Sequence, residues 1–207
     1  MIITEIVTVG KRKCKVITDS EIAFVIYKGD LHKYELKCGE EISRKVYDTL
    51  FDEILPNRAF NRLMKLLLSK DYTHSELITK LRRDGYPDSV ISKAIERIDE
   101  YGYVNDERYT KGYIESHVNR KSRETIKREL LSKGISKDRI DEAFEELTSL
   151  NLIDDETESI KKLLCKRHFD FENADYEAQK KEIQYLFRKG YKLSDIKKVI
   201  NSVCDYL

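Results

Sequence analysis

The chain has 207 residues, of which 40% are hydrophobic and 37% are charged, and its net charge is only +1. Charged residues make up about 25% of an ordinary globular protein, so the composition favours an elongated protein with much surface, and the small net charge gives no general sign of nucleic-acid binding. No apolar run approaches the ~20 residues that span a bilayer, and no secretory signal opens the sequence, so we expect a cytoplasmic protein without a membrane partner.

The first part of the chain predicts a small β element followed by helices. Three short stretches are rich in β-branched residues and are separated by polar turns: residues 2–9, 13–17 and 22–26. Asp30 is suited to be the N-cap of a short helix that ends near Gly39. Apolar residues then follow a helical spacing over residues 42–55, and this helix is expected to end at Pro56.

A long motif recurs at an offset of 49 residues. Residues 81–106 and 130–155 share leucine, glycine, isoleucine, alanine and aspartate at matching positions, and most of their other core positions exchange one apolar residue for another. A weaker third copy begins at Gly190, where the offset of 56 places an insertion within residues 167–175. A fixed period of this size indicates a repeat architecture.

Each copy predicts three amphipathic helices. The third helix of the first copy has an apolar stripe that ends at Tyr101, its counterpart ends at Leu150, and the last copy has Ile196, Val199, Ile200 and Val203 on one side. Stacked repeats cover one another's apolar faces. We therefore expect a mainly α fold, an elongated curved array of tandem three-helix repeats with a small N-terminal β-hairpin or three-strand element. The expected domains are the β element plus helices at 1–55 and three-helix repeats at 56–105, 106–154 and 155–207.

Gly85 and Gly134 follow the second helix of their repeats. We expect them to be left-handed helix C-caps, and close approach to a ligand is the alternative. The acidic stretches 104–109 and 153–156 resemble metal-ligand clusters, but their recurrence in two repeats favours N-capping, because carboxylates are stabilised at the positive end of a helix.

The sequence contains no recognisable motif for catalysis or for cofactor binding. The four histidines form no HxH or HExxH pattern, and glycine-rich phosphate-binding motifs are absent. The four cysteines, Cys204 among them, are widely spaced without a CxxC pair, so reduced thiols are expected. We predict that the protein is not an enzyme and uses neither a metal nor another cofactor.

Charges are sorted by helix in the second repeat. Residues 120–133 contain six basic and two acidic residues, whereas residues 138–146 contain five acidic residues and one basic residue. Stacked repeats could align basic helices into a stripe that binds phosphates, and the alternative is a solvated face paired with neighbouring acidic helices. The candidate stripe consists of Arg82, Arg83, Arg120, Lys121, Arg123, Lys127, Arg128 and Lys133.

The repeat residues also resemble a known family. Ser75–Leu77, Leu81, Gly85–Tyr86, Ala94, Ile98 and Gly102–Tyr109 resemble the signature of the RecX family of bacterial recombination regulators. Residues 122–135 resemble the next block of that family, and Ala23–Phe24 with residues 31–36 resembles its longer form. Thr110 departs from the pattern, since the family commonly has a small alanine-like residue there.

This resemblance implies a non-enzymatic modulator of the RecA recombinase. Family members bind RecA and its nucleoprotein filament, and they typically inhibit ATP hydrolysis, strand exchange and co-protease activity. The basic stripe would then meet filament DNA or an acidic RecA surface, and an array with capped ends is expected to be a monomer. The competing hypothesis is a stand-alone DNA-binding protein built from helical repeats, against which the near-zero net charge argues.

Overall fold

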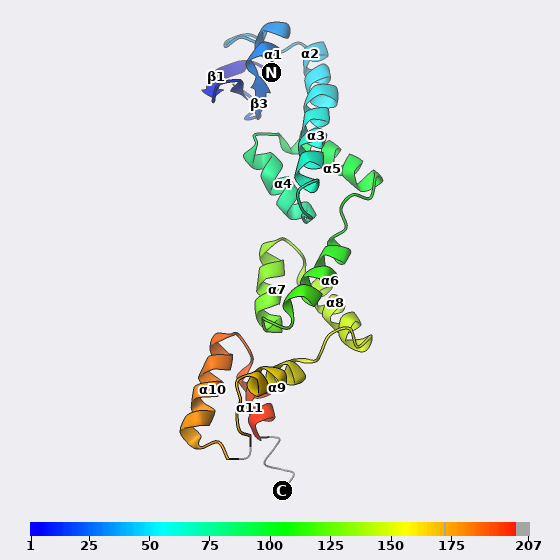
Figure 1. The fold of residues 1–207 in the computed structure, drawn as a ribbon. Helices are drawn as coiled ribbons and strands as arrows, with labels where there is room; N and C mark the ends of the chain where they lie inside the picture. Colours follow the sequence, from blue (N-terminus) through cyan, green and yellow to red (C-terminus); the bar gives the residue numbers. More distant parts are fainter. Residues whose placement is uncertain (172, 202–207) are drawn as a thin grey trace. The chain divides into compact units, whose positions relative to one another are not determined.

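The fold is taken from a computed structural model, which describes residues 1–171 and 173–201 (Figure 1). The predicted core residue Val203 and the thiol of Cys204 lie outside these ranges. The chain divides into two compact units, Met1–Asn105 and Asp106–Leu207. Each unit has its own apolar core or cores.

The N-terminal sheet is antiparallel and has the order β1-β2-β3. Its strands are β1 (Ile3–Val9), β2 (Lys13–Thr18) and β3 (Ala23–Tyr27). Val16 of β2 pairs with Phe24 of β3, and both side chains are buried. Lys15, which precedes Val16 and follows the buried Cys14, is exposed. This alternation is that of a sheet with one covered face, and it confirms the three predicted strands.

The first helix, α1 (Lys28–Lys33), begins directly after β3 and ends before Tyr34. The prediction of Asp30 as its N-cap was wrong, because Asp30 lies inside the first turn and its carboxylate accepts the Tyr27 N–H at 3.0 Å. The Arg58 guanidinium donates to both carboxylate oxygens at 2.6 and 3.0 Å. Burial alone would raise the pKa of Asp30, but these hydrogen bonds and the Arg58 charge outweigh it, so the pKa is lowered.

One helical run continues through the proline at which a helix end was predicted. It consists of α2 (Arg44–Asp48), the π-helical segment η1 (Thr49–Ile54) and α3 (Leu55–Leu67). In the π segment Leu55 N–H donates to Leu50 O, five residues back. Pro56 has no N–H for the next carbonyl, that of Phe51, and Lys93 Nζ donates to it instead at 3.3 Å. The predicted domain bound between 55 and 56 lies within this run.

Repeat 1 packs on the sheet within unit 1. Its remaining helices are α4 (His74–Arg83) and α5 (Asp88–Glu100). The Phe24 and Phe51 rings meet edge-on with centroids 5.1 Å apart, which joins sheet and helices in one core. Gly85 has φ +88° as predicted for a C-cap, and its carbonyl accepts the Val25 N–H at 3.1 Å. The close approach at Gly85 is therefore to β3.

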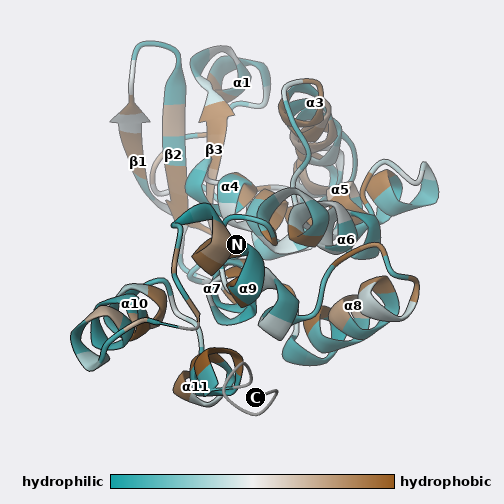
Figure 2. Ribbon diagram, turned by 60° about the horizontal axis from the view of Figure 1, so that its bottom comes forward, coloured by the Kyte–Doolittle hydropathy of each residue, from teal (hydrophilic) through white to brown (hydrophobic). Residues whose placement is uncertain are grey.

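Unit 2 contains repeats 2 and 3. Their helices are α6 (Asp106–His117), α7 (Arg123–Ser132), α8 (Lys137–Ser149), α9 (Glu156–Lys166), α10 (Tyr176–Arg188) and α11 (Leu193–Asn201). Helices such as α11 have one hydrophobic and one hydrophilic side (Figure 2). Asp155 caps α9 by accepting the Glu158 N–H at 2.8 Å, which confirms the capping interpretation there. Thr110 fits the core because its hydroxyl donates to Asp106 O at 2.6 Å.

These elements confirm a mainly α fold with tandem three-helix repeats and an N-terminal three-stranded sheet. Two apolar residues assigned to core stripes are exceptions, since Tyr101 is 56% exposed and Leu150 is 59% exposed. Each is the C-cap residue that follows its helix, where the chain turns away from the helical spacing. Among the described residues, every helix is too short or too polar to cross a bilayer.

Candidate functional site

The predicted basic residues of repeat 1 lie at the C-terminal end of α4. Arg82 and Arg83 are both exposed. Arg82 Nε donates to Asp88 at 2.8 Å, an ion pair between two well-exposed side chains. Because water and salt screen such exposed pairs, both arginines stay available to a charged partner.

The predicted basic residues of repeat 2 divide into an exposed and an internal group. Arg120 and Arg128 are exposed on the turn before α7 and on α7 itself. Lys121 Nζ donates to Glu129 at 2.8 Å. Lys127 Nζ donates to both carboxylate oxygens of Asp141 on α8, at 2.6 and 2.9 Å. The basic helix α7 and the acidic helix α8 are therefore joined by an ion pair at this position.

Lys133 belongs to an aromatic cluster of repeat 2. Its ammonium lies 5.7 Å from the Tyr109 ring centroid and 5.8 Å from that of Tyr113. Tyr113 donates its hydroxyl to Glu129 at 2.8 Å and stacks on the His117 ring. Burial, followed by the bond to Glu129, raises the pKa of Tyr113 to about 12. These contacts hold the first two helices of the repeat together.

Arg123 joins repeats 2 and 3. Its Nη2 donates to Thr148 Oγ1 at 2.9 Å and to Asp154 O at 3.2 Å, and its guanidinium lies over the Phe144 ring. Its backbone N–H donates to Glu156 at 3.1 Å. One side chain thus contacts α8, while its backbone binds the first residue of α9. Arg123 is a structural residue of this junction as well as a predicted contact residue.

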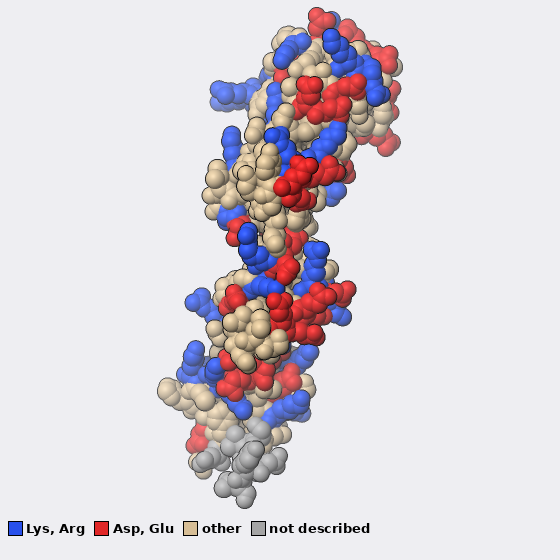
Figure 3. Space-filling view, turned by 90° about the vertical axis from the view of Figure 1, so that its right-hand side faces the viewer, with Lys and Arg blue, Asp and Glu red and all other residues tan. Residues whose placement is uncertain are grey.

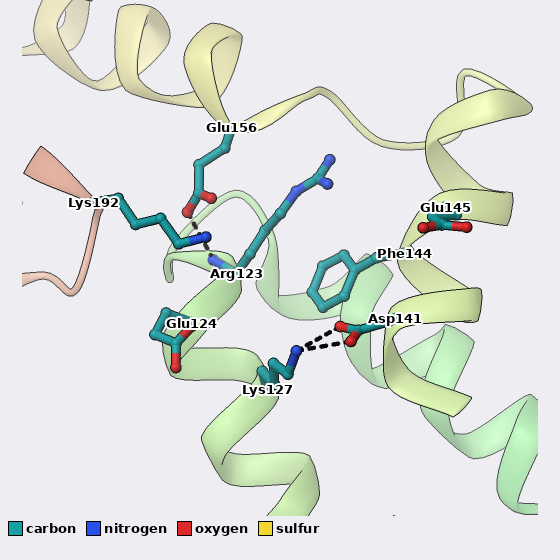
Figure 4. A pocket seen from close by; sticks show the side chains of 8 residues that line it. All are labelled: Arg123, Glu124, Lys127, Asp141, Phe144, Glu145, Glu156 and Lys192. Atoms are coloured by element: carbon teal, nitrogen blue, oxygen red, sulfur yellow. Dashed lines mark hydrogen bonds and ion pairs between the residues drawn. The ribbon is translucent and has the colours of Figure 1, made fainter. Parts of the chain in front are cut away.

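A groove of about 310 Å³ opens at this junction (Figure 4). Lys192 and Glu156 enter it from repeat 3, Phe144 enters from α8, and Arg123 lies between them. The complete lining is Arg123, Glu124, Lys127, Asp141, Phe144, Glu145, Glu156 and Lys192. Three cationic and four acidic side chains mix here, so the groove has no single sign of charge with which to select an anion.

The Glu156 carboxyl has an unusual environment for an acid. Burial raises its pKa, and the Arg123 N–H and the Arg123 charge offset this only partly. Nearby Tyr191 is also buried, which raises its pKa to about 12. Both groups favour their neutral forms relative to exposed residues.

A second contact between repeats 2 and 3 was not predicted. Gly190 has φ +87° and lies against the start of α7, where a Cβ would be 2.7 Å from Thr125 Oγ1 and 2.8 Å from Ser122 Oγ. Thr125 Oγ1 also donates to Lys189 O at 3.3 Å. The sequence showed that a glycine, Gly190, begins the third copy of the motif. The spacing of the repeats did not indicate that this glycine would contact the start of α7.

Charge on the visible face is mixed within each unit (Figure 3). Acidic side chains gather there, with basic side chains beside them. The acidic residues of α8 include Asp138, Glu142 and Glu145, which are exposed. Within the described ranges, no group of three or more histidine, cysteine, aspartate or glutamate side chains is placed to hold a metal ion.

Comparison with known families identifies the three repeats. Residues 59–97 match the model of the first three-helix domain of RecX, residues 105–143 match the second, and residues 154–200 match the third. The three matches follow one another in the family's own order.

Curated relatives match over almost the whole chain. The regulatory protein RecX of Caldanaerobacter subterraneus subsp. tengcongensis is 31% identical over 97% of this chain and 99% of its own length. Regulatory protein RecX of Clostridium beijerinckii is 29% identical over 94% of this chain and 91% of its own. Regulatory protein RecX of Bacillus subtilis is 29% identical over 97% of this chain and 76% of its own length.

Solved structures share the fold. A crystal structure of regulatory protein RecX covers 96% of this chain and 98% of its own, with a TM-score of 0.59 and 22% identity. A crystal structure of RecX from Lactobacillus salivarius covers 74% of this chain and 98% of its own, with a TM-score of 0.59 and 24% identity. With three domain matches in order and relatives of similar length, the chain belongs to the RecX family of regulatory proteins.

Proposed function

We propose that this protein is a non-enzymatic modulator of the RecA recombinase, which binds RecA and its nucleoprotein filament and lowers ATP hydrolysis, strand exchange and co-protease activity. The observation that carries this proposal is the ordered match of three RecX domains to the three helical repeats of the chain. The protein would act as a monomer in the cytoplasm, where RecA works on DNA.

The exposed basic residues are the proposed contacts for filament DNA or for an acidic RecA surface. Arg83, Arg120 and Arg128 are exposed, and Arg82 is held only by a surface ion pair. Lys121, Arg123 and Lys127 have partners within repeat 2 and at its junction with repeat 3, so a filament contact by these residues would compete with internal bonds. The exposed group is therefore the better target for a test.

The test is ATP hydrolysis by the cognate RecA on single-stranded DNA, with and without substoichiometric amounts of this protein. We expect hydrolysis to fall at well under one molecule per RecA, as for a factor that acts on filament growth or integrity. No effect on RecA, together with tight and salt-sensitive binding to bare DNA, would favour the stand-alone DNA-binding alternative.

A charge-reversal variant tests the proposed contacts. Arg83→Glu/Arg120→Glu/Arg128→Glu should raise the concentration for half-inhibition on the order of tenfold, because each reversal replaces an attraction with a repulsion. The matched control reverses three exposed charges of the β1–β2 hairpin: Lys11→Glu/Arg12→Glu/Lys15→Glu. Equal losses in both variants would point to net charge alone, and unchanged inhibition by the first variant would remove these arginines from the contact surface.

A further inference from the structure

Several helices of this protein end in the same backbone turn, with a left-handed residue after the helix, but the side chains of these turns differ in burial. The turns therefore form two classes. The first class follows the second helix of each repeat, where a left-handed glycine is followed by an apolar residue whose N–H donates back to the helix. In repeat 2 this residue is Ile135, whose N–H donates to Leu130 O, and in repeat 3 it is Tyr191, whose N–H donates to Leu186 O. Both side chains are only 2% exposed. The apolar residue after the glycine is buried in the ordinary manner of this motif.

The second class follows the third helix of repeats 1 and 2. We call Tyr101–Tyr103 exit turn 1 and Leu150–Leu152 exit turn 2. Their middle residues, Gly102 and Asn151, have φ +64° and +54°. Tyr103 N–H donates to Ile98 O at 3.3 Å, and Leu152 N–H donates to Leu147 O at 2.9 Å. The backbone is thus the same as in the first class.

The side chains of the exit turns have the opposite placement. Tyr101 and Tyr103 are 56% and 45% exposed, and Leu150 and Leu152 are both 59% exposed. The residue that follows each turn, Val104 or Ile153, is buried and anchors the turn to the repeat core. Two large apolar side chains therefore project outward at the same position of two repeats, 49 residues apart.

Packing within the repeats accounts for only part of this apolar surface. The equivalent cap positions of the first class are polar, with Asp84, Lys133 and Lys189. The Tyr101 ring lies 6.0 Å from the Phe60 ring and 5.5 Å from the Tyr103 ring, centroid to centroid, so one side of it is packed. The other side of Tyr101 and much of Tyr103, Leu150 and Leu152 remain exposed, and a polar residue would fit there. Recurrent exposed apolar pairs at a fixed position are the pattern of a protein interaction site.

Charge decides which partner these turns fit. The last helical turn before exit turn 1 contains Arg97, Asp99 and Glu100, and that before exit turn 2 contains Glu145 and Glu146. Asp99 pairs with His74 at 2.6 Å and Glu146 pairs with Lys111 at 2.7 Å, so the exposed carboxylates of Glu100 and Glu145 supply most of the negative charge beside the turns. The helix C-terminus adds partial negative charge. Bases stacked on the tyrosines would bring phosphates next to these carboxylates, which is unfavourable. A protein surface with an apolar site rimmed by lysine or arginine is complementary.

We propose that the two exit turns are equivalent contact points that engage successive copies of one basic-rimmed apolar site along a polymeric protein. This inference rests on the proposed function, which supplies the RecA filament as that polymer. Two linked contacts on neighbouring protomers would give avidity that neither contact has alone.

The test compares binding of labelled protein to RecA filaments and to a polymerisation-deficient RecA. The variants are Tyr101→Ser/Tyr103→Ser, Leu150→Ser/Leu152→Ser and the combination of all four changes. Controls are Leu68→Ser and Tyr176→Ser, which remove side chains that are 84% and 74% exposed outside the exit turns. Circular dichroism melting verifies that every variant is folded.

On filaments, each two-residue variant should lose about tenfold in affinity, because truncated central anchors typically cost that much or more. On the non-polymerising RecA each should lose at most about twofold, because the remaining turn can occupy the single site, and only the fourfold variant should lose binding. The controls should bind like the wild type on both.

Four outcomes would overturn the inference. These are full filament binding by the fourfold variant, equal losses in the controls, equal losses on both forms of RecA, or a loss confined to bare single-stranded DNA. The proposed function has a separate readout, since it fails if the wild-type protein itself neither binds RecA nor changes its ATP hydrolysis.

Discussion

The contact of Gly190 with α7 gives a prediction whose size follows from two distances. Gly190→Ala places a Cβ 2.7 Å from Thr125 Oγ1 and 2.8 Å from Ser122 Oγ. Ser122 is fully buried and caps α7 by accepting the Thr125 N–H at 3.2 Å, so its hydroxyl cannot turn away without losing the cap. Something must shift at the junction of repeats 2 and 3.

The expected loss of stability has two parts. An alanine in the left-handed conformation costs about 1–2 kcal/mol relative to glycine. Overpacking or loss of the cap adds about 1–2 kcal/mol. Unit 2 should therefore lose about 2–4 kcal/mol, which for a unit of roughly 100 residues lowers its melting temperature by about 4–8 °C per kcal/mol.

Gly102→Ala is the matched control for the backbone part. Gly102 has φ +64°, and a Cβ there would meet nothing within 4 Å. This control should lose only about 1–2 kcal/mol, and in unit 1. The assay is urea denaturation followed by circular dichroism, with hydrogen exchange of the α7 and α11 peptides to assign the change to unit 2.

A double-mutant cycle isolates the steric part. Thr125→Ala removes one of the two hydroxyls that the new Cβ would meet, so it should restore about 1 kcal/mol to Gly190→Ala while it destabilises the wild type. The reasoning is refuted if Gly190→Ala is no more destabilising than Gly102→Ala, or if the two changes at the junction are additive.

Three further predictions concern single polar groups. Lys93→Met should lower the stability of unit 1 by about 1–2 kcal/mol in urea denaturation, because Phe51 O loses its donor; an unchanged midpoint would contradict this. Asp30→Asn should cost about 1–3 kcal/mol at pH 7 by breaking the Arg58 pair. Because the folded pKa of Asp30 is lowered, the wild type should lose this advantage as pH falls through that pKa, and two urea curves that stay apart in strong acid would argue against it. The pKa of Glu156 is raised, so wild-type stability should fall as pH rises from about 4.3 through the folded pKa, and Glu156→Gln should flatten this dependence; parallel pH profiles would refute it.

Features set by local chemistry were predictable from the sequence. The strands, the repeat period and the C-cap at Gly85 follow from side-chain alternation, periodicity and backbone preference. The capping box of Thr73 and Glu76, in which each residue bonds to the backbone N–H of the other, is equally local.

Features set by distant partners were not predictable. Asp30 is bound by Arg58, 28 residues away. Pro56 cannot donate to the Phe51 carbonyl five residues earlier, and Lys93 donates to that carbonyl instead. Tyr101 continued the apolar spacing of its helix, yet the backbone turns at the cap and leaves it outside.

The candidate site was predictable only in part. The segregation of charge between residues 120–133 and 138–146 left two alternatives, a phosphate-binding stripe and pairing with neighbouring acidic helices, and Lys127 with Asp141 is one pair of the second kind. Composition could not tell which basic residues would be paired and which would stay exposed, because that depends on which side of α7 faces its neighbour. Arg128 and Lys127 are adjacent in sequence, yet only Arg128 is exposed.

The π segment Thr49–Ile54 also sets the rotational phase of the long helix in unit 1. A π turn contains about one residue more than an α-helical turn, so the side chains after this segment are rotated about the helix axis by about 100° relative to an unbroken α-helix. Phe51 can thereby face the sheet through Phe24 while Leu55, Ala59 and Leu63 are buried farther along the same helix. Deleting one residue between 49 and 54 would regularise the helix and yet misalign its two halves, so this stretch should tolerate substitution far better than any change in length.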